Sequence, residues 1–323
     1  MLRTFKNILV AAAAAATLAG ITAPAQAETR VVYKSAKSGT SYYQMGVELA
    51  NAIKAGSDGD IILTLEESQG SVQNVMEAAV RKGHYVFTSP PGLVKAAMAG
   101  QGAFEKRPAE SFAGIRALFP IPSLTMHFVT RRDGDAVERM ADLEGKRILL
   151  GKGSFGATEG EKYFKLFGLD GKVKIASAEL GNAADALKNG QIDGFVTAGS
   201  FPAPNLVQAA ASNKVALVSL TDEQIAQTGR GRQIISAGTY AGVDEDVATT
   251  FLPVDAFASA GMDDDTAYQL TRMFWQQKQE MSEHAPWWRA VEPGMLMDSG
   301  IKLHPGAIRY YDEAGVSVPD ALR

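Results

Sequence analysis

The sequence predicts an α/β fold built as two lobes. Strand-like and helix-like segments alternate in two separate runs, residues 30–99 and 147–218. Such alternation is typical of a parallel sheet that is covered by helices. Extended segments at 118–130 and 233–242 follow the two runs, and we interpret them as connectors. Two connectors mean that the chain enters the second lobe and later returns to the first, so we expect a cleft between the lobes.

Hydrophobic spacing defines the elements of the first run. Helical segments carry apolar residues three or four positions apart, as Met45, Leu49 and Ile53 do, whereas strands are short and rich in β-branched or aromatic residues. In chain order, the predicted elements are a strand at 30–33, a helix at 42–54, a strand at 61–65, a helix at 71–82, a strand at 85–87 and a helix at 91–99.

The second run has the same make-up, and the C-terminal part of the chain is more helical. From about Phe251 onward we expect mainly helix, including a long one at 263–283, and we assign this part to the first lobe. We divide the chain into lobe I at 28–125 plus 238–323 and lobe II at 126–237. The elements predicted for the second run are a strand at 147–150, a helix at 158–167, a strand at 173–176, a helix at 182–188, a strand at 195–197, a helix at 205–211 and a strand at 215–218.

The N-terminus is typical of a secretory signal. Arg3 and Lys6 precede an apolar stretch at 8–19, and Ala25-Gln26-Ala27 matches an A-x-A cleavage site. A membrane anchor is the alternative, but the apolar stretch is shorter than the roughly 20 residues that span a bilayer. We therefore expect cleavage near Ala27 and, in a bacterium, a periplasmic protein.

Composition narrows the function classes. The 323 residues include no cysteine, which excludes disulfides, thiolate metal ligands and cysteine nucleophiles. The formal net charge is −4, and a mildly acidic chain is a poor candidate for binding nucleic acid. We expect a monomer that binds a small molecule and no nucleic acid.

Motifs for catalysis are sparse. The four histidines, His84, His127, His284 and His304, lie far apart in the sequence and form no H-x-x-x-H pair, so no zinc site is indicated. The G-x-S-x-G motif of serine hydrolases is missing too. An exported hydrolase that uses the cleft is a weaker alternative. We expect a protein that is not an enzyme, with no catalytic residue, no metal and no cofactor.

Four predicted helix starts share a chemistry that suits a small anion. Residues 38–43, 68–71, 89–92 and 151–159 are each rich in glycine, serine or threonine. A helix N-terminus has unpaired N–H groups and a partial positive charge, and glycine lets a ligand approach the backbone closely. Ordinary capping explains any one of these starts. Four of them at the carboxyl ends of parallel strands indicate a pocket.

The fourth helix start also matches the dinucleotide fingerprint G-x-G-x-x-G. The match runs from Gly151 to Gly156, and Glu179 lies at the spacing of a ribose-binding carboxylate. Nucleotide cofactors are not expected outside the cytoplasmic membrane, so the predicted export argues against this interpretation.

Five motifs occur along the chain in a characteristic order, and the order carries more information than any one motif. They are Gly39–Tyr43, Gly70–Asn74, Ala141–Ile148, Gly199–Pro204 and Leu303–Tyr311. Together they resemble the TAXI-type solute-binding proteins of tripartite ATP-independent periplasmic (TRAP) transporters. The resemblance extends from about Tyr33 to Gly315.

The resemblance implies a type II periplasmic-binding-protein fold whose two lobes close over a small carboxylate such as glutamate or a related dicarboxylate. It also implies delivery of that solute to the small and large TRAP membrane subunits. A sensory receptor that signals to a membrane kinase is the alternative. Carried over by motif, the ligand-binding residues would be Ser41, Tyr42, Tyr43, Gly70, Ser71, Asn74, Ser89, Ser154, Phe155, Ala157, Thr158, Ser200, Phe201 and Pro204.

Two departures from the family pattern bear on the ligand. Phe155 and Ala157 stand where the family usually has hydroxyl residues, so hydroxyl donors are lost or moved. Lys34 and Lys37 stand where small residues are common. Either lysine could pair with a ligand carboxylate, although most lysines in proteins are solvated.

Overall fold

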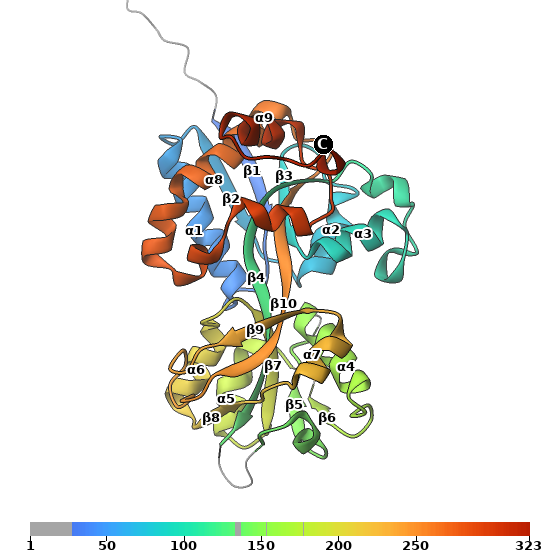
Figure 1. Ribbon diagram of the computed structural model, residues 1–323, viewed down its shortest axis with the longest axis vertical. Coiled ribbons are helices and arrows are strands. Elements are labelled where there is room, and N and C mark those ends of the chain that lie inside the picture. Colours follow the sequence, from blue (N-terminus) through green and yellow to red (C-terminus); the bar gives the residue numbers. More distant parts are fainter. Residues whose placement is uncertain (1–27, 133–136, 153, 177) are drawn as a thin grey trace, which may run out of the picture.

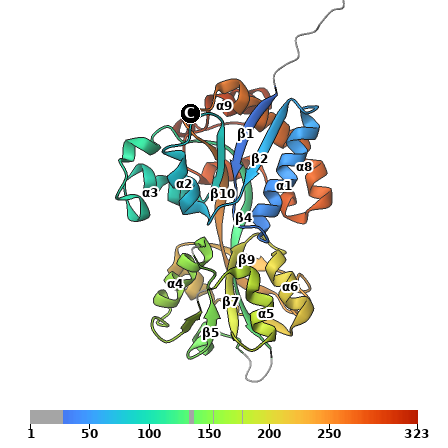
Figure 2. The same cartoon turned by 180° about the vertical axis from the view of Figure 1, so that it is seen from behind.

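Two lobes joined by two long strands make up the protein (Figure 1). The connecting strands are β4 (Arg116–Arg131) and β10 (Val247–Ala258), and views from both sides show them passing together from one lobe to the other (Figures 1 and 2). The predicted signal segment, 1–27, lies outside the described residues. The structure is a computed structural model that describes residues 28–132, 137–152, 154–176 and 178–323.

Lobe I consists of β1 (Thr29–Lys34), α1 (Ser41–Gly56), β2 (Ile61–Glu66), α2 (Ser71–Ala78), β3 (Tyr85–Ser89), α3 (Pro91–Met98), α8 (Asp264–His284) and α9 (Pro305–Glu313). Strand β1 pairs in parallel with β2 on one side and β3 on the other. Helix α8 packs against α1 and α9. As predicted, Met45, Leu49 and Ile53 form the buried face of α1.

Lobe II consists of β5 (Arg147–Leu149), α4 (Phe155–Leu166), β6 (Lys174–Ala176), α5 (Ala183–Lys188), β7 (Gly194–Gly199), α6 (Pro204–Ser212), β8 (Val215–Leu217), α7 (Asp222–Thr228) and β9 (Gly231–Ile235). Short 3-10 helices complete the two lobes at Gly102–Phe104, Ala109–Phe112, Met140–Leu143, Leu180–Asn182, Pro286–Ala290, Pro293–Asp298 and Asp320–Leu322.

One sheet runs through both lobes in the order β2-β1-β3-β10-β4-β7-β5-β6, with β8 beside β4 and β9 beside β10. Strand β4 pairs with β10 along its first part and with β7 and β8 along its last part. Strand β10 pairs with β9 at its start and with β3 at its end. Each connecting strand therefore belongs to the sheet of both lobes, so the lobes share a hinge made of hydrogen-bonded strands.

In the part of the chain that the structure describes, buried apolar side chains form two clusters. The larger cluster runs through lobe I and along one face of the sheet in lobe II, where it includes Phe128 and Val196. The smaller cluster covers the other face of that sheet and includes Val129, Phe195 and Leu206. Neighbouring residues fall into different clusters because successive side chains of a strand point to opposite faces.

The return to lobe I lies later in the chain than the sequence predicts. Residues 233–242 contain the end of β9 and a turn, and Tyr240 and Val243 pack in the smaller cluster of lobe II. The return is made by β10, although we expected mainly helix from about Phe251. A strand that pairs on both edges with elements of two lobes is a tertiary feature, so the local pattern does not reveal it. The division of the chain into two lobes that each move as a unit stays a prediction.

Helix α4 begins three residues earlier than predicted. The Oγ of Ser154 accepts a hydrogen bond from the backbone N–H of Ala157 at 3.0 Å, which caps the helix at this point. Gly156 of α4 packs so closely on strand β7 that a Cβ at this position would lie 3.1 Å from Ala198. Helix α2 ends at Ala78 rather than at residue 82. Helix α7, which is capped by Thr221, is absent from the prediction.

Candidate functional site

A cavity of about 520 Å³ lies between the two lobes. Residues 35–40 and 67–71 line it from lobe I, and residues 154–156 and 179–181 line it from lobe II. Leu124 of β4 and Val254 of β10, the two connecting strands, also line it. Its volume falls in the range of about 300–1,000 Å³ that is typical of small-molecule sites.

The N-terminal ends of α1, α2, α4 and α6 all reach this cavity. Thr40 caps α1, Gly70 caps α2 and Ser154 caps α4, while Asn205 lies in the first turn of α6. The starts of α2 and α4 face each other from opposite lobes, because a Cβ on Gly70 would lie 3.6 Å from the backbone nitrogen of Phe155. The N-terminal ends of several helices thus converge on one space, where the partial positive charge of a helix start favours an anion.

Three of the four helix starts that the sequence singled out contribute to the cavity, namely those at 38–43, 68–71 and 151–159. The start at 89–92 does not, although Thr88 just before it does. Ser89 is buried, and its hydroxyl donates to the carbonyl of Pro90 at 3.1 Å. The fourth helix start at the cavity is that of α6, which the sequence did not single out.

The predicted ligand-binding residues therefore occupy different places. Those that line the cavity are Tyr42, Gly70, Ser71, Ser154 and Phe155. Those outside its lining are Ser41, Tyr43, Asn74, Ser89, Ala157, Thr158 and Pro204, and Thr158 is exposed. Ser200 and Phe201 line a second cavity, of about 560 Å³, described further below.

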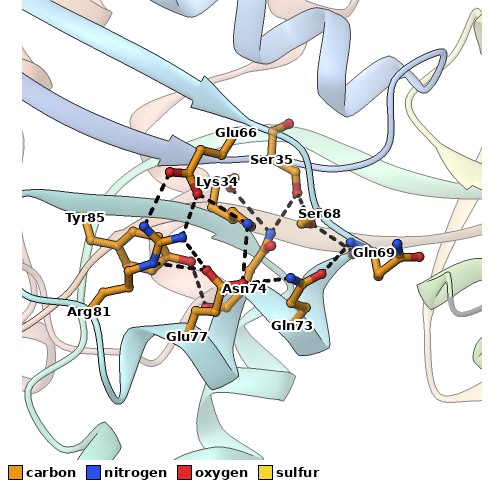
Figure 3. A network of polar contacts seen from close by, with 11 residues as sticks. Lys34, Ser35, Glu66, Ser68, Gln69, Gln73, Asn74, Glu77, Arg81 and Tyr85 are labelled. Carbon is orange, nitrogen blue, oxygen red and sulfur yellow. Dashed lines mark hydrogen bonds and ion pairs between the residues drawn. The ribbon is translucent and has the colours of Figure 1, made fainter.

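Asn74 holds the backbone next to the cavity and lies outside its lining. Its side chain is fully buried, and its amide donates to the carbonyl of Ser35 at 2.8 Å (Figure 3). The same amide donates to the carbonyl of Thr88 at 2.9 Å. The hydroxyl of Ser68 donates to the carbonyl of Ser35 at 3.1 Å. These bonds tie the ends of β1 and β3 to α2, so Asn74 positions the lining residues Ser35 and Thr88.

Lys34 pairs with protein carboxylates. Its buried ammonium lies 3.3 Å from Glu66 and 3.4 Å from Glu77, and Arg81 contacts both carboxylates at 2.6 and 2.8 Å (Figure 3). Burial alone would raise the pKa of the two carboxyls, but hydrogen bonds from Arg81 and the charge of Lys34 outweigh it and lower both pKa values. The charge of Lys34 is thereby balanced inside lobe I.

Lys37 pairs with Glu179 across the cleft. The ammonium contacts the Glu179 carboxylate and also donates to the carbonyl of Lys152 at 3.1 Å, so a residue of lobe I binds two residues of lobe II. Glu179, which lies at the sequence spacing of a ribose-binding carboxylate, thus has a lysine partner. Glu67, the other charged residue of the lining, accepts a hydrogen bond from the backbone N–H of Ser38 at 2.7 Å.

Asn205 is a lining residue that the sequence reasoning missed. It is 8% exposed, and no described residue accepts a hydrogen bond from its Nδ2. A buried amide donor without a partner costs free energy, which a ligand oxygen can recover. The family resemblance pointed to its neighbour Pro204. The only local signal is the position of Asn205, directly after the proline that opens α6.

Within residues 28–132, 137–152, 154–176 and 178–323, no group of three or more histidine, aspartate or glutamate side chains is placed to hold a metal ion. No helix in the same residues is long and apolar enough to cross a bilayer.

Residues 34–315 match the profile of a family described as the NMT1-like family. MatC from Rhodopseudomonas palustris with bound malate is similar at 14% identity and a TM-score of 0.56, over 88% of this chain and 98% of that one. The periplasmic binding protein BugD is similar at 12% identity and a TM-score of 0.56, over 90% and 99%. This chain therefore has the two-lobed fold of periplasmic binding proteins.

Proposed function

The chain belongs to the NMT1-like family, and on that premise we propose that it is a periplasmic solute receptor for a small organic anion. The proposed ligand is a carboxylate such as glutamate or a related dicarboxylate. It binds in the cavity between the lobes, and bending of the connecting strands β4 and β10 closes the lobes around it. Binding involves no chemical step. The order of motifs along the chain supports assignment to the TAXI type.

The facing starts of α2 and α4 are the observation that carries this proposal. Each helix end offers backbone N–H groups and about half a positive charge to the same space. The unpartnered amide of Asn205 adds a side-chain donor from lobe II. Lys37 is the one cationic side chain among the described lining residues and is already paired. An anion would therefore be held by oriented donors from both lobes, which favours the closed arrangement.

Delivery to the small and large TRAP membrane subunits is the second part of the proposal, and the motif order supports it. A receptor that signals to a membrane kinase would use the same cleft. Vesicles that contain the TRAP subunits separate the two roles. Uptake of the bound solute that depends on added receptor supports transport, and receptor-independent or absent uptake contradicts it.

A thermal-shift screen tests the binding function. The purified protein is unfolded and refolded to remove bound solute, and its melting temperature is measured with a panel of small metabolites. We expect a concentration-dependent rise with one class of carboxylates, and recovery of the compound unchanged. A rise only with sugars, amines or nucleotides would contradict an anion site.

Paired variants test the position of the site. Ser71→Ala removes a hydroxyl from the cavity lining, and we expect it to weaken carboxylate binding by about 1 kcal/mol, measured by calorimetry. The sequence alone predicts a similar loss for Thr158→Ala. Thr158 is exposed and outside the lining, so we now expect that variant to bind normally. The reverse pattern would place the ligand elsewhere.

A further inference from the structure

A second cavity, of about 560 Å³, lies on the hinge side of the molecule. Lobe II contributes residues 200–202 to its lining, and lobe I contributes the segment that includes 286–287 and 289–291. The connecting strands contribute Ser123 and Thr125 of β4 and Phe251 of β10. It is as large as the cleft between the lobes and, like the cleft, is formed by both lobes.

The two cavities lie on opposite faces of the connecting strands. Leu124 lines the cleft, whereas its neighbours Ser123 and Thr125 line the hinge-side cavity. Successive side chains of a strand point to opposite faces, so β4 separates the two spaces. On β10, Val254 lines the cleft and Phe251 lines the hinge-side cavity. Bending these strands so that the cleft narrows must widen the hinge-side cavity.

The lining of the hinge-side cavity is mainly apolar and aromatic. Phe201, Phe251, Trp287 and Met295 all contribute to it, and each is only partly buried. The indole N–H of Trp287 donates to Glu48, outside the lining, at 3.0 Å. Because its polar atom is already satisfied, the ring can offer its carbon surface to a ligand.

Among the described residues that line this cavity, Arg289 is the one charged residue. Its Nε donates to the carbonyl of Ser282 at 3.2 Å, and no carboxylate of the described residues forms an ion pair with it. A guanidinium binds carboxylates, sulfonates and phosphates through its terminal N–H groups. The matching ligand has an apolar body for the aromatic lining and an anionic group for Arg289.

We propose that the hinge-side cavity is a second ligand site, which binds a small anion with an aromatic or aliphatic body and favours the closed form of the lobes. Its occupant would fill the space that widens when the cleft narrows. Coupling between two sites is reciprocal, so closure of the cleft would also strengthen binding at the hinge. The coupling rests on the proposed closure of the lobes, whereas the binding site itself does not.

Fluorescence of 1-anilinonaphthalene-8-sulfonate tests the site without any cleft ligand. This probe has an aromatic body and a sulfonate, and it becomes bright when it leaves water. We expect saturable binding that weakens at least tenfold in Arg289→Gln and in Ala290→Trp, which fills the cavity from an exposed position. Arg107→Gln, at an exposed arginine of lobe I, should bind the probe as the original protein does. No binding, or equal binding by all variants, would overturn the proposed site.

A distance measurement tests the coupling. The chain has no cysteine, so Gln101→Cys and Lys165→Cys place one spin label on an exposed position of each lobe. The probe should shift the distance distribution toward the closed form, and Arg289→Gln should abolish the shift. If saturating probe leaves the distance distribution unchanged, the coupling is refuted. A negative result in either experiment leaves the carboxylate screen intact, so failure of this inference is distinguishable from failure of the proposed function.

Discussion

The backbone N–H of Ser200 in lobe II donates a hydrogen bond to the Oγ of Ser41 in lobe I at 3.1 Å. The hydroxyl of Ser200 donates in turn to the carbonyl of Ser123 in β4 at 2.8 Å. This contact joins the lobes directly beside the hinge strand. It also depends on Gly199, since a Cβ there would lie only 2.5 Å from the Oγ of Ser41. Two residues that the family resemblance assigned to the ligand thus hold the lobes together.

Gly199→Ala should weaken capture of the carboxylate identified in the thermal screen. The new methyl group must displace the Ser41 hydroxyl and break its bond to Ser200, so we expect a loss of about 1 kcal/mol, or roughly fivefold in affinity by calorimetry. Gly92→Ala is the control, because a Cβ at Gly92 meets nothing within 4 Å.

The Ser41→Ala background separates this clash from a general effect of the alanine. The Cβ of Ser41 would lie 3.7 Å from the new methyl group, which is an ordinary contact. Adding Gly199→Ala to the Ser41→Ala variant should therefore cause no further loss of carboxylate affinity. An equal loss in both backgrounds would show that Ser41 is not the obstacle.

Lys37→Met should reduce the population of the closed form. The ion pair to Glu179 crosses the cleft, but the Glu179 side chain is 58% exposed, so the pair is worth at most about 1 kcal/mol, or roughly fivefold in the closed-to-open ratio. Spin labels at residues 101 and 165 report this ratio. Salt at about 1 M should also lower the closed-to-open ratio of the original protein, because salt screens exposed charges.

A matched pair within one lobe provides the control for Lys37→Met. Glu144 and Lys172 of lobe II approach to 3.8 Å, and both side chains are exposed. Glu144→Gln should leave the distance distribution unchanged. A closed fraction that is insensitive to both Lys37→Met and salt would mean that the ion pair does not hold the lobes together.

Asn205→Asp should abolish carboxylate binding. The change keeps the shape of the side chain, removes its N–H donor and adds a negative charge to the cavity lining. We expect a loss of at least about 3 kcal/mol, or more than a hundredfold, because the donor is replaced by a repelling group. Gln208→Glu adds the same charge at an exposed position of α6 and should have little effect. Tighter binding by Asn205→Asp would indicate a ligand with a donor or a cation there.

His127 should make the protein less stable as the pH falls below neutrality. It is buried between the carbonyl of Thr125 and the hydroxyl of Tyr240, and burial lowers its pKa from 6.5 to about 4. The unfolded chain binds a proton near pH 6.5 and the folded protein only near pH 4. The contribution of His127 to the free energy of unfolding is therefore complete above pH 6.5 and declines as the pH falls from 6.5 toward 4. At pH 5 it has fallen by about 2 kcal/mol.

Urea unfolding at pH 7 and pH 5 measures this decline. His127→Gln should reduce the difference between the two pH values by about 2 kcal/mol. A smaller slope should remain, because burial also lowers the pKa of His304. An unchanged difference in His127→Gln would assign the pH dependence to other groups.

Much of the cleft could be predicted because its helix starts are local features. Thr40 and Ser154 cap α1 and α4 through bonds to residues three positions later, and these bonds depend only on neighbouring side chains. Parallel strands then bring such starts to one edge of the sheet. The helix starts around Gly70 and Ser154, which the local pattern predicts, both line the cleft.

The parts that escaped prediction connect residues that are far apart in the sequence. Lys37 and Glu179 are separated by 142 positions, and neither has a sequence neighbour that reveals its partner. Ser200 and Phe201 belong to the Gly199–Pro204 motif, which ends one residue before Asn205. Asn205 lines the cleft, whereas Ser200 and Phe201 line the cavity on the other side of β4. Spacing along the chain does not indicate on which side of a strand a loop will lie.

The sequence by itself determined the alternation of strands and helices, the chemistry of the helix starts and the existence of two connected lobes. These follow from side-chain periodicity and capping within a few residues. Only the tertiary structure decided which strand returns the chain to lobe I, which charges are already paired and which helix starts share one cavity. Those outcomes depend on the pairing of β4 and β10 with both lobes, and that pairing brings together side chains more than a hundred residues apart.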